Sequence, residues 1–149
     1  IFDILLTLYI LCKYYQKIMN TKLNKIFAEI SAGELVDKIT ILEIKKEKIN
    51  DESKLIELNK ELSSLKKTYN DTIVSNSSLD SIYMELLNVN KKLWKIEDEK
   101  RKTEKEKKFD KNFIELSRNV YKLNDQRSKL KLKINQLLGS NISEVKSHY

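Results

Sequence analysis

The chain contains no proline and only two glycines, Gly33 and Gly139, in 149 residues. These two residue types build most tight turns and strand bulges, so their scarcity argues against a fold rich in sheet. Charged residues make up 34% of the chain, and lysine, glutamate, leucine and isoleucine dominate it. This composition is typical of long amphipathic helices around a modest core. At this length we expect a single domain.

The chain has one cysteine, Cys12, and one histidine, His148. An intrachain disulfide is therefore impossible, and no Cys/His metal site can form. A histidine-based catalytic triad is excluded for practical purposes, because the single histidine stands next to the last residue of the sequence. We expect a reduced, cytoplasmic protein with no metal and no cofactor, and an enzymatic activity is not the favoured interpretation.

A long apolar run is also missing. Residues 1–18 are apolar up to Cys12 and then basic, but this stretch is shorter than the roughly 20 residues that span a bilayer. It also lacks the basic start and the cleavage site of a signal peptide. Either these residues precede a native start at Met19, or they are the remainder of a membrane-contacting helix, and a membrane is a partner only in the second case. We assign residues 19–139 to one helical domain and residues 140–149 to a flexible tail.

The net charge is +7, from 29 basic and 22 acidic residues. Such a charge suggests nucleic-acid binding. However, the two signs alternate closely, as in KIEDEKRKTEKEKK at 95–108, which is typical of a solvated helix face. We therefore rank weak nucleic-acid binding third among the functions and expect no specific nucleic-acid partner. Three arginines, Arg101, Arg118 and Arg127, stand out among 26 lysines.

The spacing of apolar residues predicts four main helices. Ser31 and Glu34 form a capping-box pattern that opens a helix from Ala32 to about Ile49. Asp51 caps a second helix, along which Leu55, Leu58, Leu62, Leu65 and Tyr69 recur at steps of three and four. The polar stretch from 70 to 78 predicts a loop.

The third predicted helix begins near Leu79, and its apolar face ends at Ile96, before the charged run. Asp110 caps a fourth helix, which ends at Gly139 in a left-handed position. The short connection between the first two helices favours an antiparallel hairpin. We therefore expect an all-α fold, an antiparallel helical bundle or pair of helical hairpins, with the third and fourth helices as a long charged arm.

Polar residues interrupt the apolar stripe of the fourth helix at Asn124 and Arg127. A polar group left buried without a partner costs roughly 1–3 kcal/mol, so we expect Glu97 and Asp98 of the third helix to face Arg127. The whole candidate cluster comprises Asn90, Trp94, Glu97, Asp98, Asn124, Asp125 and Arg127. Two interpretations are open: the cluster fixes the register of two helices, or Arg127 binds an anionic ligand or a partner.

A second group of charges, Glu34, Asp37, Lys38 and Lys45, lies on the first predicted helix. Neighbours in a helix point in different directions, so Asp37 and Lys38 do not form an acid–base pair by spacing. We interpret this group as a solvated face. Trp94 and Tyr121 fall on helical stripes, where aromatic side chains are usually part of the core.

Three segments resemble an uncharacterised family of bacterial proteins with the patterns GELxDKITILxIK and FIxLxRxVYxxNDxR. They are GELVDKITILEIKKEKI at 33–49, LWKIEDEKR at 93–101 and FIELSRNVYKLNDQRSKLKLKINQLLG at 113–139. The resemblance implies a small helical protein of unknown function. It also implies a genetic setting beside glycosyltransferases and surface-polysaccharide genes, or fusion to sugar-transfer modules. The residues that match the family pattern include Glu34, Asp37, Lys38, Trp94, Glu97, Asp98, Arg118, Tyr121, Asn124, Asp125 and Arg127.

The favoured function is a non-enzymatic interaction module, linked to cell-envelope sugar transfer, with a protein partner or a second copy of the chain. Candidate residues for binding a ligand or partner are Lys38, Trp94, Glu97, Asp98, Arg118, Asn124, Asp125 and Arg127. The alternative is a small helical enzyme or binder of an anionic molecule, such as a sugar phosphate or nucleotide sugar, by analogy with chorismate mutases. Its ligating cations would be Lys38, Arg118, Arg127 and Lys131, with Glu97 as an acid or orienting group, although the chain lacks the N-terminal arginine of those enzymes.

Overall fold

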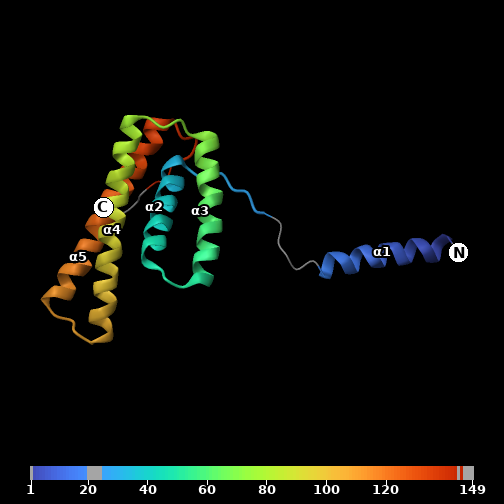
Figure 1. Ribbon diagram of the computed structural model, residues 1–149, viewed down its shortest axis with the longest axis horizontal. Helices are drawn as coiled ribbons and strands as arrows, with labels where there is room; N and C mark the ends of the chain where they lie inside the picture. The colour runs from blue at the N-terminus through green and yellow to red at the C-terminus, as the bar shows by residue number, and fades with distance from the viewer. Residues whose placement is uncertain (1, 20–24, 144, 146–149) are drawn as a thin grey trace.

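The computed structural model describes residues 2–19, 25–143 and 145, and these contain five α-helices and no strand. The all-α prediction is confirmed. The helices are α1 (Phe2–Met19), α2 (Ala32–Lys48), α3 (Glu52–Thr72), α4 (Ser77–Lys105) and α5 (Lys111–Leu138), as Figure 1 shows. Residues 20–24 of the expected domain lie outside the described residues, as do residues 144 and 146–149 of the expected tail, among them His148.

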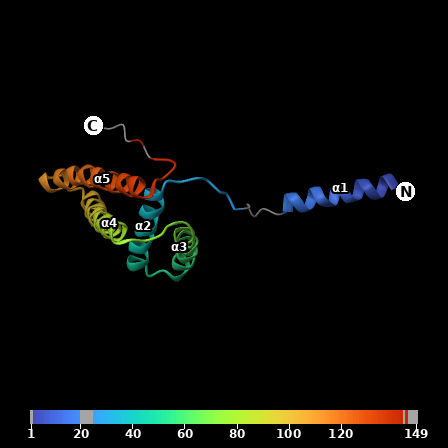
Figure 2. The same ribbon diagram turned by 90° about the horizontal axis from the view of Figure 1, so that it is seen from above.

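Helices α4 and α5 form a long antiparallel hairpin, and α2 crosses it between the hairpin and α3 (Figures 1 and 2). One apolar cluster joins α2 to the hairpin through Val36, Leu79, Leu86, Val89, Leu93, Leu130 and Ile134. A second joins α2 to α3 through Leu35, Ile39, Leu42, Leu58 and Leu62. Because α2 buries side chains on both sides, it is the central element of the bundle.

The helix ends follow the predicted capping residues. The hydroxyl of Ser31 accepts a hydrogen bond from the backbone N–H of Glu34 (3.2 Å), and Asp51 accepts one from Lys54 (3.2 Å). Asp110 accepts from the first turn of α5. Gly139 ends α5 with a φ of 62°, in the left-handed conformation. Three of these boundaries depend on a capping side chain within three positions of the helix end, and the fourth depends on the backbone conformation of Gly139.

The predicted loop at 70–78 is shorter in the structure, because α3 continues to Thr72 and α4 begins at Ser77. The backbone N–H of Ile73 still bonds to the carbonyl of Tyr69 (2.8 Å), and the Ile73 side chain packs against the core. Asn76 then caps α4 by accepting the N–H of Leu79 (2.9 Å). The polar residues at 70–72 and 77–78 therefore lie on exposed helix turns, and Ser75 and Asn76 remain in the connection.

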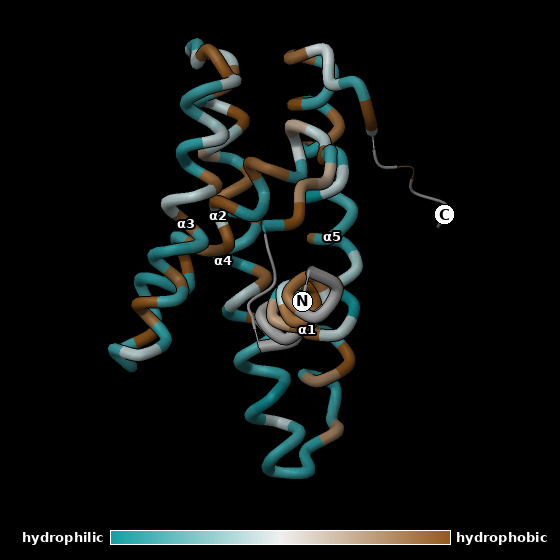
Figure 3. The backbone as a smooth tube through the Cα atoms, turned by 90° about the vertical axis from the view of Figure 1, so that its right-hand side faces the viewer, coloured by the Kyte–Doolittle hydropathy of each residue, from teal (hydrophilic) through white to brown (hydrophobic). Residues whose placement is uncertain are grey.

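Beyond the crossing with α2, the α4–α5 hairpin continues alone, and we call its residues 94–124 the arm (Figure 1). Figure 3 shows that most of the arm is hydrophilic. The seam between its two helices nevertheless repeats every seven residues, with Leu79, Leu86 and Leu93 on α4 and Leu116, Leu123 and Leu130 on α5. A repeat of seven keeps the same sides of two helices facing each other along their length.

The first residues of the predicted tail form hydrogen bonds with other parts of the chain. The hydroxyl of Ser140 accepts the backbone N–H of Ala32 (3.1 Å), and the amide of Asn135 donates to Ser143 (3.3 Å). The amide of Asn141 donates to Glu29 (2.7 Å). These bonds hold residues 140–143 against the start of α2.

Helix α1 lies apart from the other four helices in both views (Figures 1 and 2). Its described side chains, residues 5–13, are exposed. Within the described residues, no helix has the length and apolar character that crossing a bilayer requires.

Candidate functional site

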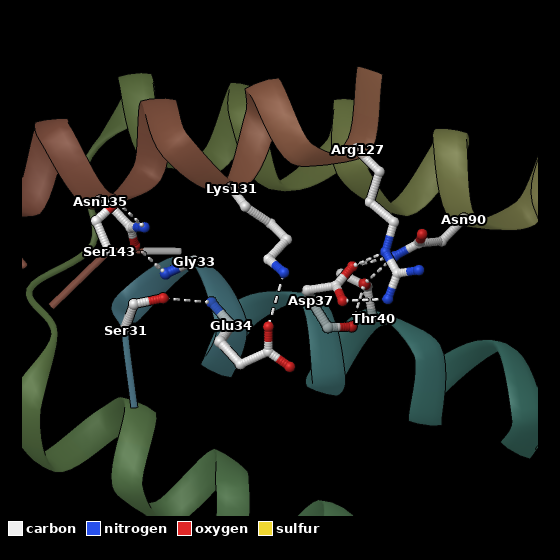
Figure 4. A network of polar contacts seen from close by, with 10 residues as sticks. All are labelled: Ser31, Gly33, Glu34, Asp37, Thr40, Asn90, Arg127, Lys131, Asn135 and Ser143. Atoms are coloured by element: carbon white, nitrogen blue, oxygen red, sulfur yellow. Dashed lines mark hydrogen bonds and ion pairs between the residues drawn. The ribbon is translucent and has the colours of Figure 1, made fainter. Parts of the chain in front are cut away.

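The carboxylate of Asp37, at the centre of the polar site, is almost completely buried, with 1% of the residue exposed. Arg127 of α5 reaches it from above, as Figure 4 shows. The Nε of Arg127 donates to Oδ1 of Asp37 at 2.8 Å, and its Nη2 donates to Oδ2. This two-pronged geometry is the strongest pairing available to a guanidinium and a carboxylate.

Asn90 of α4, the other helix of the hairpin, completes the site. Its side-chain amide donates to Oδ1 of Asp37 and to the hydroxyl of Thr40, both at 2.9 Å. The hydroxyl of Thr40 in turn donates to the backbone carbonyl of Asp37 at 2.8 Å. Within the described residues, no buried side-chain oxygen or nitrogen is left without a hydrogen-bond partner. The site therefore ties three helices together at the point where α2 crosses the hairpin.

Two further contacts continue along α5, one turn at a time. The Nζ of Lys131 lies 2.7 Å from a carboxylate oxygen of Glu34, and only 10% of the Lys131 side chain is exposed. The side-chain oxygen of Asn135 accepts the backbone N–H of Gly33 at 2.6 Å. Arg127, Lys131 and Asn135, spaced four apart, thus hold the first turns of α2 against α5 (Figure 4).

Gly33 allows the closest approach between these two helices. A Cβ atom built at this position would collide with the backbone carbonyl oxygen of Lys131 and lie 2.9 Å from the side-chain oxygen of Asn135. Real Cβ atoms do not approach so closely, so a side chain here would force α2 away from α5. Glycine is required at this position for packing, within an ordinary helical backbone.

A second polar cluster surrounds Glu43 of α2, where this helix lies between α3 and α4. The phenol of Tyr83 on α4 donates to one of its carboxylate oxygens at 2.6 Å, and Lys66 of α3 contacts the other at 2.7 Å. Burial, followed by the hydrogen bond to Glu43 and its negative charge, raises the pKa of Tyr83 above its usual value. This cluster, which the sequence did not indicate, fixes α2 between α3 and α4.

The interpretation of the charges on α2 as a solvated face is wrong for Asp37, which is buried, while Glu34 is half-buried and bound to Lys131. Arg127 and Asn90 do share a polar cluster, but the carboxylate at its centre comes from α2. Glu97 is half-buried and Asp98 exposed on the arm. The prediction that Glu97 and Asp98 face Arg127 considered only the two helices of the hairpin. It left out α2, whose Asp37 bonds to Arg127.

The remaining candidate residues lie around this crossing and on the arm. Lys38 is exposed beside Asp37, and Arg118 is exposed on α5. Trp94 is half-buried one turn beyond Asn90. The amide of Asn124 donates to the carbonyl of Val120 in its own helix (3.0 Å), and Asp125 is half-buried and has an interaction partner.

Chemically, this arrangement holds helices in place. Two of the cations considered for an anionic ligand, Arg127 and Lys131, each contact a carboxylate of α2. Among the described residues, no group of three or more His, Cys, Asp or Glu side chains is arranged to hold a metal ion. The site is therefore best described as a buried polar junction, and the exposed candidates belong to the arm beyond it.

A family model matches residues 26–149, and the chain therefore belongs to this family, which is described as a family of unknown function, DUF6165. No curated protein and no solved structure shows significant similarity to the chain.

Proposed function

We propose that this protein is a non-enzymatic interaction module in which the bundle of α2 to α5 holds out the arm for a protein partner. The setting we propose for it is cell-envelope sugar transfer. The resemblance of its motifs to bacterial proteins encoded near glycosyltransferases supports that setting.

The proposal rests on the seven-residue repeat of the hairpin. The positions of α4 that contact α2 have equivalents one repeat further along, on the arm. Asn90 and Lys91 of α4 both contact α2, the latter through Glu47 at 3.1 Å. Seven residues further along, the equivalent positions are Glu97 and Asp98. Because the seam of the hairpin repeats every seven residues, these two side chains face the same side as Asn90 and Lys91.

The same relation holds on α5. Asn124 lies seven residues before Lys131, and Tyr121 lies fourteen residues before Asn135. Lys131 and Asn135 bind α2, so Asn124 and Tyr121 face the side of the hairpin on which α2 lies. Tyr121 is 56% exposed. We call this side the arm face, formed by Trp94, Glu97, Asp98, Arg101, Ile114, Tyr121 and Asn124, with Arg118 at its edge.

The composition of the arm face suits a protein partner. It carries the only tryptophan of the chain, an exposed tyrosine, and Arg101 and Arg118, two of the three arginines. Tryptophan, tyrosine and arginine are the residue types that dominate binding energy at protein interfaces. Within the described residues, α2 covers only the base of this side, and α3 packs against α2 and away from the arm.

The buried junction supports the same function mechanically. Breaking a paired buried charge is costly, so the contacts of Asp37 with Arg127 and Asn90 hold α2 at one place on the hairpin. The arm then extends from a fixed base. A partner would meet a preorganised surface, which lowers the entropy lost on binding.

Site-specific photo-crosslinking tests this proposal. A photoreactive phenylalanine analogue would replace Tyr121 in the full chain, expressed in the native host. The control protein would carry the same analogue in place of Glu57, which is exposed on α3. We expect position 121 to form a discrete protein adduct, identifiable by mass spectrometry, that position 57 does not form. The absence of an adduct from position 121, or the same adducts from both positions, would contradict the proposal.

A further inference from the structure

The arm face carries charges of both signs. Their order along α4 is complementary to the same order read in the opposite direction, so acids would lie opposite bases in two antiparallel copies. On α4, Glu97 and Asp98 are followed one turn later by Arg101. Within the described residues, none of these three side chains forms an ion pair. Two copies of this stretch lying antiparallel, with their centres near residue 99, would place the acids of each against Arg101 of the other.

We propose that the partner of the arm face is a second copy of this chain, packed face to face with the two arms antiparallel. This inference rests on the proposed function, because it names the partner of the same surface. The two hairpins would together form a four-helix bundle, with α4 against α4 and α5 against α5 of the partner copy.

The position of α2 selects the antiparallel arrangement. Helix α2 lies on the same side of the hairpin as the arm face and covers its base at Asn90 and Arg127. If both bases stood at the same end, the two α2 helices would collide. With the arms reversed about residue 99, Asn90 of one copy is level with about residue 108 at the tip of the other arm, so each α2 meets the end of the opposite arm and the two α2 helices stay apart.

The apolar residues of α5 fit the same arrangement. Asn90 and Arg127 both reach Asp37 and are therefore level with each other, so in this antiparallel hairpin residue 99 is level with about residue 118. Reversal about that level places Tyr121 of one copy opposite Ile114 of the other. Ile114 is 48% exposed and lies twenty-one residues, or three repeats, before Asn135. The α4 charges and the α5 apolar pair thus share one two-fold axis, as an isologous interface requires.

Sedimentation equilibrium of the full chain tests the inference. We expect a reversible dimer, weakened at least tenfold by Arg101→Glu, since the two-fold axis introduces each repulsion twice. The triple variant Glu97→Lys, Asp98→Lys, Arg101→Glu exchanges the signs and should restore the dimer. Lys92→Glu, on the opposite side of α4, reverses a charge without touching the arm face and should leave the dimer unchanged. Circular dichroism would verify that each variant remains folded.

The outcomes separate the two proposals. A monomeric wild-type chain whose position 121 still crosslinks to one other protein would overturn the second copy as partner and leave the interaction module standing. A dimer that Arg101→Glu does not weaken would overturn the proposed interface. A monomer with no specific adduct at position 121 would overturn both proposals.

Discussion

Asp37 is the residue on which the arrangement of the helices depends most. A carboxylate removed from water loses several kcal/mol of solvation, which only good pairing offsets. Arg127 supplies a two-pronged partner, and Asn90 supplies a further donor. The three residues come from three different helices. A buried charge with partners on two other elements penalises every arrangement in which α2 is shifted or rotated.

We therefore expect Arg127→Met to destabilise the protein by about 3–5 kcal/mol, because it leaves Asp37 buried with an uncompensated charge. The double variant Asp37→Asn, Arg127→Met removes both charges and should recover part of that loss. Urea unfolding followed by circular dichroism measures both free energies. A double variant less stable than Arg127→Met alone would contradict this account of the junction.

Tyr83 makes the stability of the protein depend on pH in the alkaline range. Its pKa is raised in the folded state, so its contribution is fully present below the unfolded pKa of about 10 and is lost as pH rises above that value. At pH 8, Tyr83→Phe should cost about 1.5 kcal/mol, the value of a hydrogen bond to a charged group. Glu43 keeps Lys66 as a partner in this variant.

The difference between wild type and Tyr83→Phe should shrink as the pH rises above 10. Urea unfolding at pH 8 and pH 11 measures the unfolding free energies of the two proteins. Both proteins share the lysines and the other tyrosines, so the titration of these groups cancels in the difference between the two free energies. A constant difference at the two pH values would show that the phenol proton does not contribute to this contact.

At the scale of the elements, what could be predicted from the sequence is what depends on nearby residues. Ser31, Asp51, Asp110 and Gly139 set helix ends through bonds within a few positions, and all four act as expected. The buried junction could be predicted only in part. Asn90 and Arg127 stand out because they are polar beside apolar stripes.

Their partner could not be identified in this way. Asp37 is ninety residues from Arg127 in the sequence. Its own helix also carries many other charged residues, such as the neighbouring Lys38. Periodicity assigns one apolar face to each helix, but α2 packs against the hairpin on one side and against α3 on the other. Which helix crosses which is decided by contacts between distant segments, and a single-helix pattern does not contain them.

The packing of α2 on α5 depends on Gly33. In an open helix, replacing glycine by alanine stabilises by up to about 1 kcal/mol. Here the added methyl group would strike the carbonyl of Lys131 and crowd Asn135. We expect Gly33→Ala to destabilise by about 1–3 kcal/mol, as overpacking does. Lys38→Ala, exposed in the same helix, should change the stability by less than about 0.5 kcal/mol. A more stable Gly33→Ala variant would mean that α2 and α5 are not in such close contact.

For the molecule as a whole, the net charge of +7 attracts polyanions, but the charges are spread rather than gathered into one basic patch. Several exposed lysines lie next to acids on their own helix, such as Lys67 beside Asp71 and Lys95 near Glu99. Their fields partly cancel, and the Debye length of about 8 Å at physiological salt screens the rest.

We therefore expect the protein to bind DNA only weakly, without sequence preference, and with a steep loss of affinity as salt rises. Fluorescence anisotropy of two labelled duplexes of different sequence, in about 50 mM and about 200 mM salt, measures both properties. The two duplexes should bind alike at the lower salt and lose most of their binding at the higher one. Tight binding that survives the higher salt, or a clear preference for one duplex, would require contacts to the bases. Such a result would make nucleic-acid binding a second function of this chain and not a non-specific charge attraction.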